Sequence, residues 1–135
     1  MEDCIFCKII KGEMPSYKVY EDDDVLAFLD ITPVNPGHTL VISKSHHETL
    51  LQLPGDLACK LITVIKKITP AVVKSVEAEG FNLCQNNGSV SGQVVGHVHF
   101  HIIPRFDNDG HKLWSGKEYG EGRVENVLNK IKQEL

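Results

Sequence analysis

The chain has 135 residues, of which 41% are hydrophobic and 24% charged, so it can fill a core and is not disordered by composition. Its 14 basic and 18 acidic residues give a formal net charge of −4, which argues against general binding to a nucleic-acid backbone. We expect one domain over residues 1–135 in the cytosol, because the sequence has neither the roughly 20-residue apolar run of a membrane span nor the basic-then-apolar order of a secretion signal.

The first third of the chain predicts one short helix and three strands. Apolar residues interleaved with lysines over 5–11, followed by Gly12, indicate a short amphipathic helix. Strands are expected over 17–21, 25–29 and 38–44. An acidic turn separates the first two, and a loop rich in proline and glycine precedes the third.

The middle of the chain predicts a long helix followed by two more strands. Apolar residues three or four apart over 56–78 mark one buried stripe, and Pro70 should kink or interrupt that helix. The next strands are expected over 81–85 and 97–103, the second of them stopped by Pro104.

The C-terminal part, residues 106–135, predicts a polar, irregular segment and a final short helix. Trp114 is the expected main anchor of the irregular part, and the helix is indicated by Val124, Val127, Leu128 and Ile131. Only one crossover helix of useful length is present, so a doubly wound parallel sheet is disfavoured. We expect class α+β: a five-stranded antiparallel sheet with one long helix and short terminal helices packed against it.

The four cysteines fall into two groups. Cys59 and Cys84 lie in apolar patterns and are expected to be small buried hydrophobic residues. Cys4 and Cys7 form a C-x-x-C pair, which supplies half of the four ligands that a structural zinc ion takes. Spacing alone leaves zinc binding and an inert pair level, with a redox pair below both, because a redox pair should follow a strand of a βαβ unit.

Three histidines alternate with apolar residues in the last predicted strand. Because side chains of a strand alternate between faces, His97, His99 and His101 should share one face, each about 7 Å from the next. They can form an exposed polar face, a three-histidine metal site or a catalytic group. The preceding glycine-rich loop carries the uncharged amides of Asn86 and Gln93, which suits phosphorus chemistry better than a metal cage.

Four blocks of the sequence resemble, in order, the histidine triad (HIT) superfamily, its Hint branch and bacterial Hit-type relatives in particular. The blocks are 4–10, 28–33, 36–42 and 97–103, and the last matches the signature His-φ-His-φ-His-φ-φ. The resemblance covers about residues 4–105 and leaves 106–135 as a C-terminal extension. It implies a HIT-like fold whose sheet continues across a homodimer.

The resemblance also implies an activity: hydrolysis of purine nucleoside 5′-monophosphate derivatives, phosphoramidates above all, at the α-phosphate. His99 would attack phosphorus and form a nucleotidyl-histidine intermediate, while His101 would donate to a phosphate oxygen. His97 completes the triad, and His38 matches the family's additional histidine near the phosphate. The other implied contacts are with phosphate and leaving group (Asn86, Gln93), ribose (Asp30) and base (Phe6, Phe28, Ile31, Leu40).

Zinc-binding relatives imply a structural Cys₂His₂ site made of Cys4, Cys7, His46 and His97, which leaves His99 and His101 free. No organic cofactor and no nucleic-acid or membrane partner is implied. One position departs from the family pattern, because Val94 stands where relatives usually carry a serine or threonine hydroxyl that assists the leaving group. Two alternatives therefore stay open: a dinucleoside polyphosphate hydrolase or nucleotidyltransferase, and a nucleotide- or zinc-binding regulatory module with little turnover.

Overall fold

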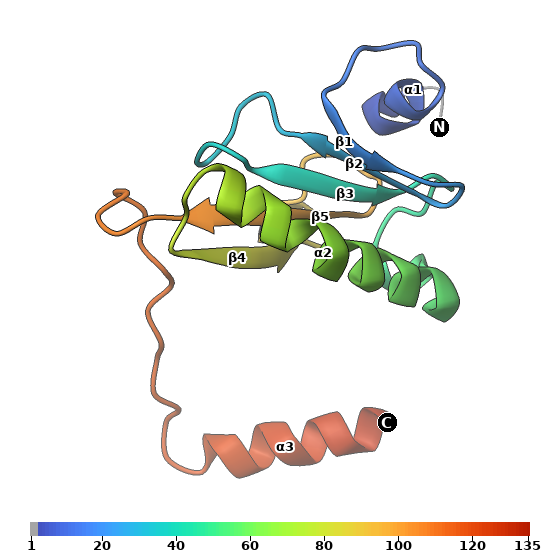
Figure 1. The fold of residues 1–135 in the computed structure, drawn as a ribbon. Helices are drawn as coiled ribbons and strands as arrows, with labels where there is room; N and C mark the ends of the chain where they lie inside the picture. Colours follow the sequence, from blue (N-terminus) through green and yellow to red (C-terminus); the bar gives the residue numbers. More distant parts are fainter. Residues whose placement is uncertain (1–2) are drawn as a thin grey trace.

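The computed structural model describes residues 3–135 and has the expected α+β architecture (Figure 1). One antiparallel sheet has the strand order β1-β2-β3-β5-β4. Its strands are β1 Lys18–Glu21, β2 Val25–Leu29, β3 Thr39–Ser43, β4 Gly80–Gln85 and β5 His99–Arg105. The helices are α1 Ile5–Ile10, α2 Gly55–Ser75 and α3 Arg123–Glu134, with short 3₁₀ helices at Leu50–Gln52 and Ser89–Ser91.

The alternation of side chains gives the sheet two different faces. On one face, buried residues of β2, β3 and β5 pack against the apolar stripe of α2, which includes Leu61 and Ile65. On the other face, Phe6 and Ile9 of α1 pack on the alternate residues of β2 and β3. The register pairs Leu40 of β3 with His101 of β5, so the histidine row belongs to the α1 face.

The expectation for Pro70 is wrong where it foresaw an interruption, because α2 continues through this residue. Proline removes the hydrogen bond to the carbonyl four residues earlier, which here belongs to Lys66. Pro70 and Lys66 are both exposed, so water can satisfy that carbonyl.

The expected bounds of the last strand are also wrong, since β5 begins at His99 and continues through Pro104. Beyond Ile102 only β4 pairs with β5. A strand residue directs its N–H and C=O to the same side, and Asn35 Nδ2 donates to the Pro104 carbonyl at 2.9 Å on the side that β3 has left. The missing N–H of the proline therefore costs no strand-pairing bond.

The C-terminal extension does not pack on the sheet as expected. Figure 1 shows α3 standing apart from the body, on the side of β4 and α2, at the end of a long connecting segment. No residue of α3 is buried, and Trp114, the expected anchor, is 96% exposed. A second expectation also fails, because Cys59 lies on the exposed side of α2, whereas Cys84 is half-buried.

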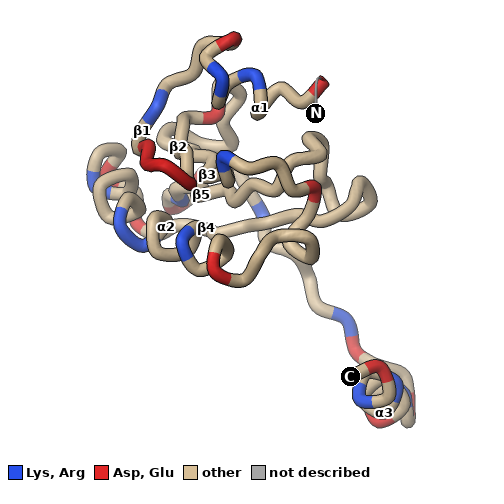
Figure 2. Tube along the Cα trace, turned by 90° about the vertical axis from the view of Figure 1, so that its right-hand side faces the viewer, with Lys and Arg blue, Asp and Glu red and all other residues tan. Residues whose placement is uncertain are grey.

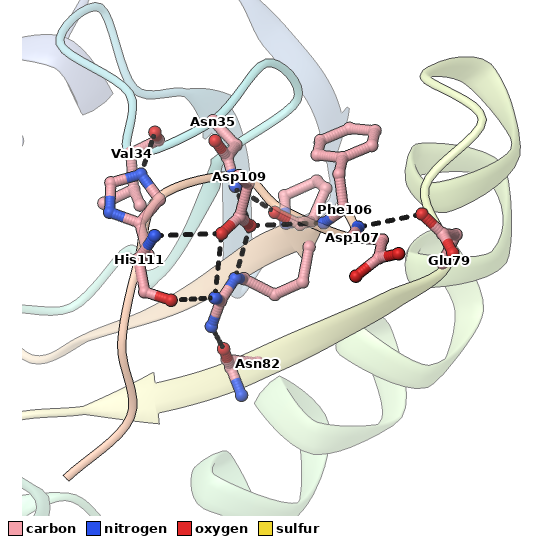
Figure 3. Close-up of polar contacts among 10 residues, drawn as sticks. Val34, Asn35, Glu79, Asn82, Phe106, Asp107, Asp109 and His111 are labelled. Atoms are coloured by element: carbon pink, nitrogen blue, oxygen red, sulfur yellow. Dashed lines mark hydrogen bonds and ion pairs between the residues drawn. The ribbon is translucent and has the colours of Figure 1, made fainter.

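A polar network fixes the start of the extension (Figure 3). The Asp109 carboxylate accepts hydrogen bonds from Arg105 Nε at 2.7 Å, from Asn35 Nδ2 at 2.9 Å and from the backbone N–H of His111 at 3.0 Å. Arg105 also donates to Asn82 Oδ1 of the neighbouring strand. These contacts hold residues 105–111 in one direction as the chain leaves β5.

Charged residues of both signs are distributed over the body and α3 (Figure 2). Lysines pair with the acidic residues around the first turn: Lys60 of α2 contacts Asp24 of the turn at 2.7 Å, and Lys44 contacts Glu21 at the end of β1 at 2.9 Å. Within residues 3–135, none of the helices is sufficiently long and apolar to cross a bilayer.

Candidate active site

The histidine row of His97, His99 and His101 lies on the face of the sheet that α1 covers. His97 and His99 are buried, and the ring of Phe6 from α1 meets both of them edge-on, with centroid separations of 5.9 and 5.1 Å. His101 is half-buried, 4.9 Å from the His99 ring. His47 supports the row from outside, because its carbonyl accepts the N–H of Val98 at 2.7 Å.

The contacts of His99 assign its tautomer. Its Nδ1 lies 2.7 Å from the carbonyl oxygen of His97, which can only accept a hydrogen bond. Nδ1 must therefore carry the proton and donate it, which leaves a lone pair on Nε2. A neutral imidazole with one nitrogen anchored and the other free is the arrangement that a histidine nucleophile needs.

A second hydrogen-bond chain assigns the tautomers of His38 and His101. The backbone N–H of Val34 donates to His38 Nδ1 at 3.0 Å, so the proton of neutral His38 resides on Nε2. His38 Nε2 then donates to His101 Nδ1 at 2.8 Å. His101 consequently carries its own proton on Nε2, where it can donate to an anionic oxygen.

Burial keeps these imidazoles neutral. It lowers the pKa of His38 and His99 below the usual 6.5, and it lowers the pKa of His97 and His101 to about 4. Neighbouring rings add to the effect on His101, since a charge on His99 or His38 would disfavour a second charge beside it. At neutral pH the site thus offers one lone pair and one N–H donor without a net charge.

An apolar pocket of about 160 Å³ is lined by two residues next to the histidines: Phe6, whose ring meets His99, and Leu40, which pairs with His101. Its walls come from α1, from the segment after α1, and from β2 and β3. All five residues expected at the base and ribose line it: Phe6, Phe28, Asp30, Ile31 and Leu40. Asp30 Oδ1 accepts hydrogen bonds from Thr32, while its Oδ2 lies 3.8 Å from His38 Nε2.

Sequence reasoning missed Ser16, which lines the same pocket. Its Oγ is buried and makes no hydrogen bond within the described residues 3–135. The signal available in the sequence was weak, because a serine after proline is ordinary in a loop. A buried hydroxyl without a partner carries a desolvation cost, which a hydrogen bond formed on ligand binding would offset.

The two predicted residues of the glycine-rich loop, Asn86 and Gln93, have different surroundings. Asn86 is half-buried beside Gly92, where the backbone has φ +99° and a Cβ would lie 3.5 Å from Asn86 Nδ2. Gln93 holds the loop itself: its Oε1 accepts the N–H of Gly88 at 2.8 Å, and its Nε2 donates to the carbonyls of Glu48 and Val95. Both donors of the Gln93 amide are thus used by the chain in this arrangement.

Cys4, Cys7, His46 and His97 converge on one point. The nitrogen atoms of the two histidines are 3.2 Å apart, and the sulfur-to-nitrogen distances between cysteines and histidines are 3.3 to 3.6 Å. A tetrahedral zinc ion with ordinary bond lengths requires separations of about 3.3–3.6 Å between such atoms. His97 Nε2 donates to the Ser43 carbonyl at 2.7 Å, which leaves Nδ1 as the ligand atom. The four residues fit a structural zinc ion.

Asp30, His38 and His101 form a second cluster with close ligand atoms. The tautomer of His38 argues against a metal there, because its Nδ1 already accepts the N–H of Val34 and its Nε2 carries the proton. A metal ligand needs a free lone pair. This cluster is better described as a hydrogen-bonding group next to the pocket.

A model of the HIT domain family matches residues 11–108 of the chain. An uncharacterised HIT-like protein of Methanocaldococcus jannaschii is 51% identical over 96% of this chain and 98% of its own length. An adenosine 5′-monophosphoramidase of Candida albicans is 41% identical over 98% of this chain and 91% of its own. An adenylylsulfatase of Arabidopsis thaliana is 44% identical over 85% of this chain and 57% of its own.

Solved structures agree with these sequence matches. A HIT-family protein of Bacillus subtilis aligns with a TM-score of 0.90 at 43% identity, over 98% of this chain and 97% of its own. A zinc-bound histidine triad protein of Mycobacterium smegmatis aligns with a TM-score of 0.78 at 32% identity, over 99% of both chains.

Proposed function

The chain belongs to the HIT domain family, and from this premise we propose that it hydrolyses purine nucleoside 5′-monophosphate derivatives, phosphoramidates above all, at the α-phosphate. The enzyme class, a HIT-type nucleotide hydrolase, follows from relatives named adenosine 5′-monophosphoramidase and adenylylsulfatase. Both names describe cleavage at an adenosine 5′-phosphate unit, with an amine or sulfate as the leaving group.

One observation carries the proposal: the protonation pattern across the row of histidines. His99 holds its proton against the His97 carbonyl and presents Nε2 as a nucleophile, while His101 presents an N–H. The pair stands beside an apolar pocket whose rim carries the Asp30 carboxylate, a hydrogen-bond acceptor suited to ribose hydroxyls. A nucleoside monophosphate unit needs these features together: the histidine pair for its phosphate, the carboxylate for its ribose and the apolar pocket for its base.

The reaction proceeds in two displacements. His99 Nε2 forms a bond to the α-phosphorus while the bond from phosphorus to the leaving group breaks, which gives a nucleotidyl-histidine and a free leaving group; a departing amine takes its proton from solvent. Water then attacks the phosphorus and gives up a proton to solvent, the bond to Nε2 breaks, and the nucleoside monophosphate leaves with His99 restored. His101 Nε2–H donates to a non-bridging oxygen, where negative charge grows in both transition states.

Val94 favours leaving groups that need no proton from the protein. Its side chain is 93% exposed and has no hydroxyl, so it cannot protonate a departing amine. A dinucleoside polyphosphate, or transfer of the nucleotidyl group to another acceptor, is therefore the second candidate function. Side-by-side turnover of an adenosine 5′-phosphoramidate and a diadenosine polyphosphate distinguishes the two.

Mass spectrometry of the intact protein, quenched rapidly after mixing with an adenosine 5′-phosphoramidate, tests the mechanism. We expect a nucleotidyl adduct on His99, and no adduct or hydrolysis in His99→Ala, which should still bind AMP. Unchanged hydrolysis in this variant would remove His99 from the mechanism. Nucleotide binding without turnover of any substrate would favour the regulatory module instead.

We propose zinc as the structural ion of the Cys4/Cys7/His46/His97 cluster. The distances among the ligand atoms support it, and so does the zinc-bound relative from Mycobacterium smegmatis. When bound, zinc would supply a crosslink between α1 and the start of β5. The free Nε2 of His99 and Nε2–H of His101 lie outside that ligand set.

We also propose a homodimer in which the edge strand β4 meets its counterpart. Phe81 and Leu83 of β4 are 47% and 42% exposed, and with α2 they line an apolar groove of about 490 Å³. An exposed apolar edge strand is a template for pairing with another chain. Because α3 stands apart from the body on the side of β4 and α2 in Figure 1, a second copy on β4 would also cover the amphipathic α3.

A further inference from the structure

Helix α1 depends on contacts with the rest of the molecule. It has six residues, far fewer than the roughly 12–15 that an isolated helix needs in water. Phe6 and Ile9 supply its apolar contacts. Among the described residues, the polar side-chain contacts that join 3–16 to the rest of the chain are those of Cys4 and Cys7 with His46 and His97.

The same segment forms one wall of the apolar pocket. Residues of α1 and of the loop after it face β2 and β3 across the cavity. The wall consists of Ile5, Phe6, Ile9, Met14, Pro15 and Ser16. Ser16, whose Oγ is buried and has no hydrogen-bond partner within residues 3–135, is therefore part of the pocket lining only when this segment is in place.

Phe6 connects the two regions directly. It lies between the two cysteines in the sequence, and its ring contacts His97, His99 and Phe28 at centroid distances of 5.9, 5.1 and 5.6 Å. Fixing both cysteines on His46 and His97 thus fixes the ring that closes the pocket beside the nucleophile. The histidine row needs no such support, because β5 is paired on both sides.

We propose that metal binding at Cys4, Cys7, His46 and His97 assembles the nucleotide pocket, so that metal occupancy controls nucleotide affinity. Without the metal, segment 3–16 is joined to the rest of the chain only by weak thiol–imidazole contacts in place of coordinate bonds, so the wall carrying Phe6 and Ser16 becomes mobile and the pocket opens. The inference rests on the proposed function only for the identity of the ligand. The coupling between metal and pocket is a property of α1.

The test compares zinc-loaded protein with protein treated with a chelator, using two readouts that do not involve turnover. Calorimetry with AMP should show at least about tenfold weaker binding without zinc, since the Phe6 ring and the apolar wall around it no longer cover the bound nucleotide. Amide hydrogen exchange should become faster in residues 5–16 and stay unchanged in β3 and β5, which also shows that the metal-free protein is folded.

Three variants separate the metal from the pocket. Cys4→Ser should reproduce the metal-free behaviour at ordinary zinc concentrations, and Cys59→Ser, the matched control on the exposed side of α2, should behave as the wild type. Phe6→Ala in the zinc-loaded form should weaken AMP binding and leave zinc affinity unchanged within about threefold.

Equal AMP affinity and equal exchange in residues 5–16 with and without zinc would overturn the inference, as would a failure of the four residues to bind zinc. If zinc protects residues 5–16 but the loaded protein binds no AMP, the proposed function fails and the metal-dependent ordering of α1 stands. The two proposals are therefore tested separately.

Discussion

His97 makes three contacts from one residue. Its Nε2 donates to the Ser43 carbonyl, its Nδ1 faces the cysteines, and its own carbonyl accepts the proton of His99. The first and third contacts fix the orientation of two imidazoles by backbone carbonyls. Because the ring nitrogens and the carbonyl of His97 all have partners, the neighbouring His99 ring can adopt only one useful tautomer.

His38 should act as a positioning residue for His101. In His38→Asn the donor to His101 Nδ1 is lost, and His101 can place its proton on either nitrogen. We expect kcat to fall about 10²-fold or more, with AMP affinity kept within about threefold, as for loss of one proton-transfer or donor group. Steady-state kinetics together with calorimetry measures both, and a rise in KM at constant kcat would contradict the role.

Ser16 should contribute to binding of the base. We expect Ser16→Ala to weaken AMP binding by about threefold to tenfold, the effect of one hydrogen bond, without changing binding of ribose 5-phosphate. Ser45→Ala, outside the pocket, is the matched control. Equal losses for both ligands would place the Ser16 hydroxyl away from the base.

Protonation of the buried histidines should destabilise the fold in acid. Burial lowers the pKa of His101 to about 4 from 6.5, so His101 binds a proton more tightly in the unfolded chain than in the folded protein. The contribution of neutral His101 to the free energy of unfolding is fully present above pH 6.5 and is lost as the pH falls toward 4. The melting temperature should therefore fall over that range, less steeply in His101→Asn, whereas His111→Asn should follow the wild type. Identical slopes in all three proteins would rule this out.

At the scale of elements, strand β5 joins the two functional regions. Its alternate side chains serve different layers: Phe100 and Ile102 pack with α2, while His99 and His101 face α1 and the pocket. It is paired on both sides, with β3 and with β4. Side chains on such an interior strand are held more closely than side chains on a loop.

The junction between β5 and the C-terminal extension should depend on Asp109. The Arg105 guanidinium holds the pKa of that carboxyl well below its usual range, and backbone N–H groups add to the effect. Asp109→Asn should lower the melting temperature at neutral pH, and its loss and that of Arg105→Gln should be less than additive, because both variants remove the shared ion pair. Additive losses in this double-mutant cycle, followed by thermal unfolding, would show that the pair does not act as a unit.

At the scale of the whole molecule, one partner, a second copy of this chain, can cover both the apolar groove of α2 and β4 and the exposed α3. Each leaves apolar surface uncovered, and α3 stands on the side of the body where α2 and β4 lie (Figure 1). In a dimer with a two-fold axis beside β4, the groove and α3 of each copy would both be buried.

Leu83→Lys should therefore shift the protein toward monomer, raising the dimer dissociation constant at least about tenfold, because it places a charge in the apolar groove. Leu51→Lys, at a residue 91% exposed and outside the groove, is the matched control. Sedimentation analysis over a range of concentrations measures the shift. A wild-type protein that stays monomeric at high concentration would disprove the dimer.

Much of this protein could be read from its sequence because the information is local. Period-two alternation in 97–103 assigns the imidazoles and the apolar residues to opposite faces, and the ordered blocks identify the family. The same reasoning failed at Pro70, Pro104 and Trp114. In those cases the outcome depends on what lies beside the residue: solvent next to α2, the end of β3, and an extension that leaves the body.

The sequence by itself determined the α+β class and the family and predicted the residues for the chemistry, since residue type and spacing along a strand or helix suffice for these. Only the tertiary structure decided which nitrogen of His38, His99 and His101 holds the proton, that α1 forms one wall of the pocket, and that Ser16 lines it. These features depend on atoms brought within about 3 Å from segments distant in the sequence, and hydrogen bonds vary steeply over such distances.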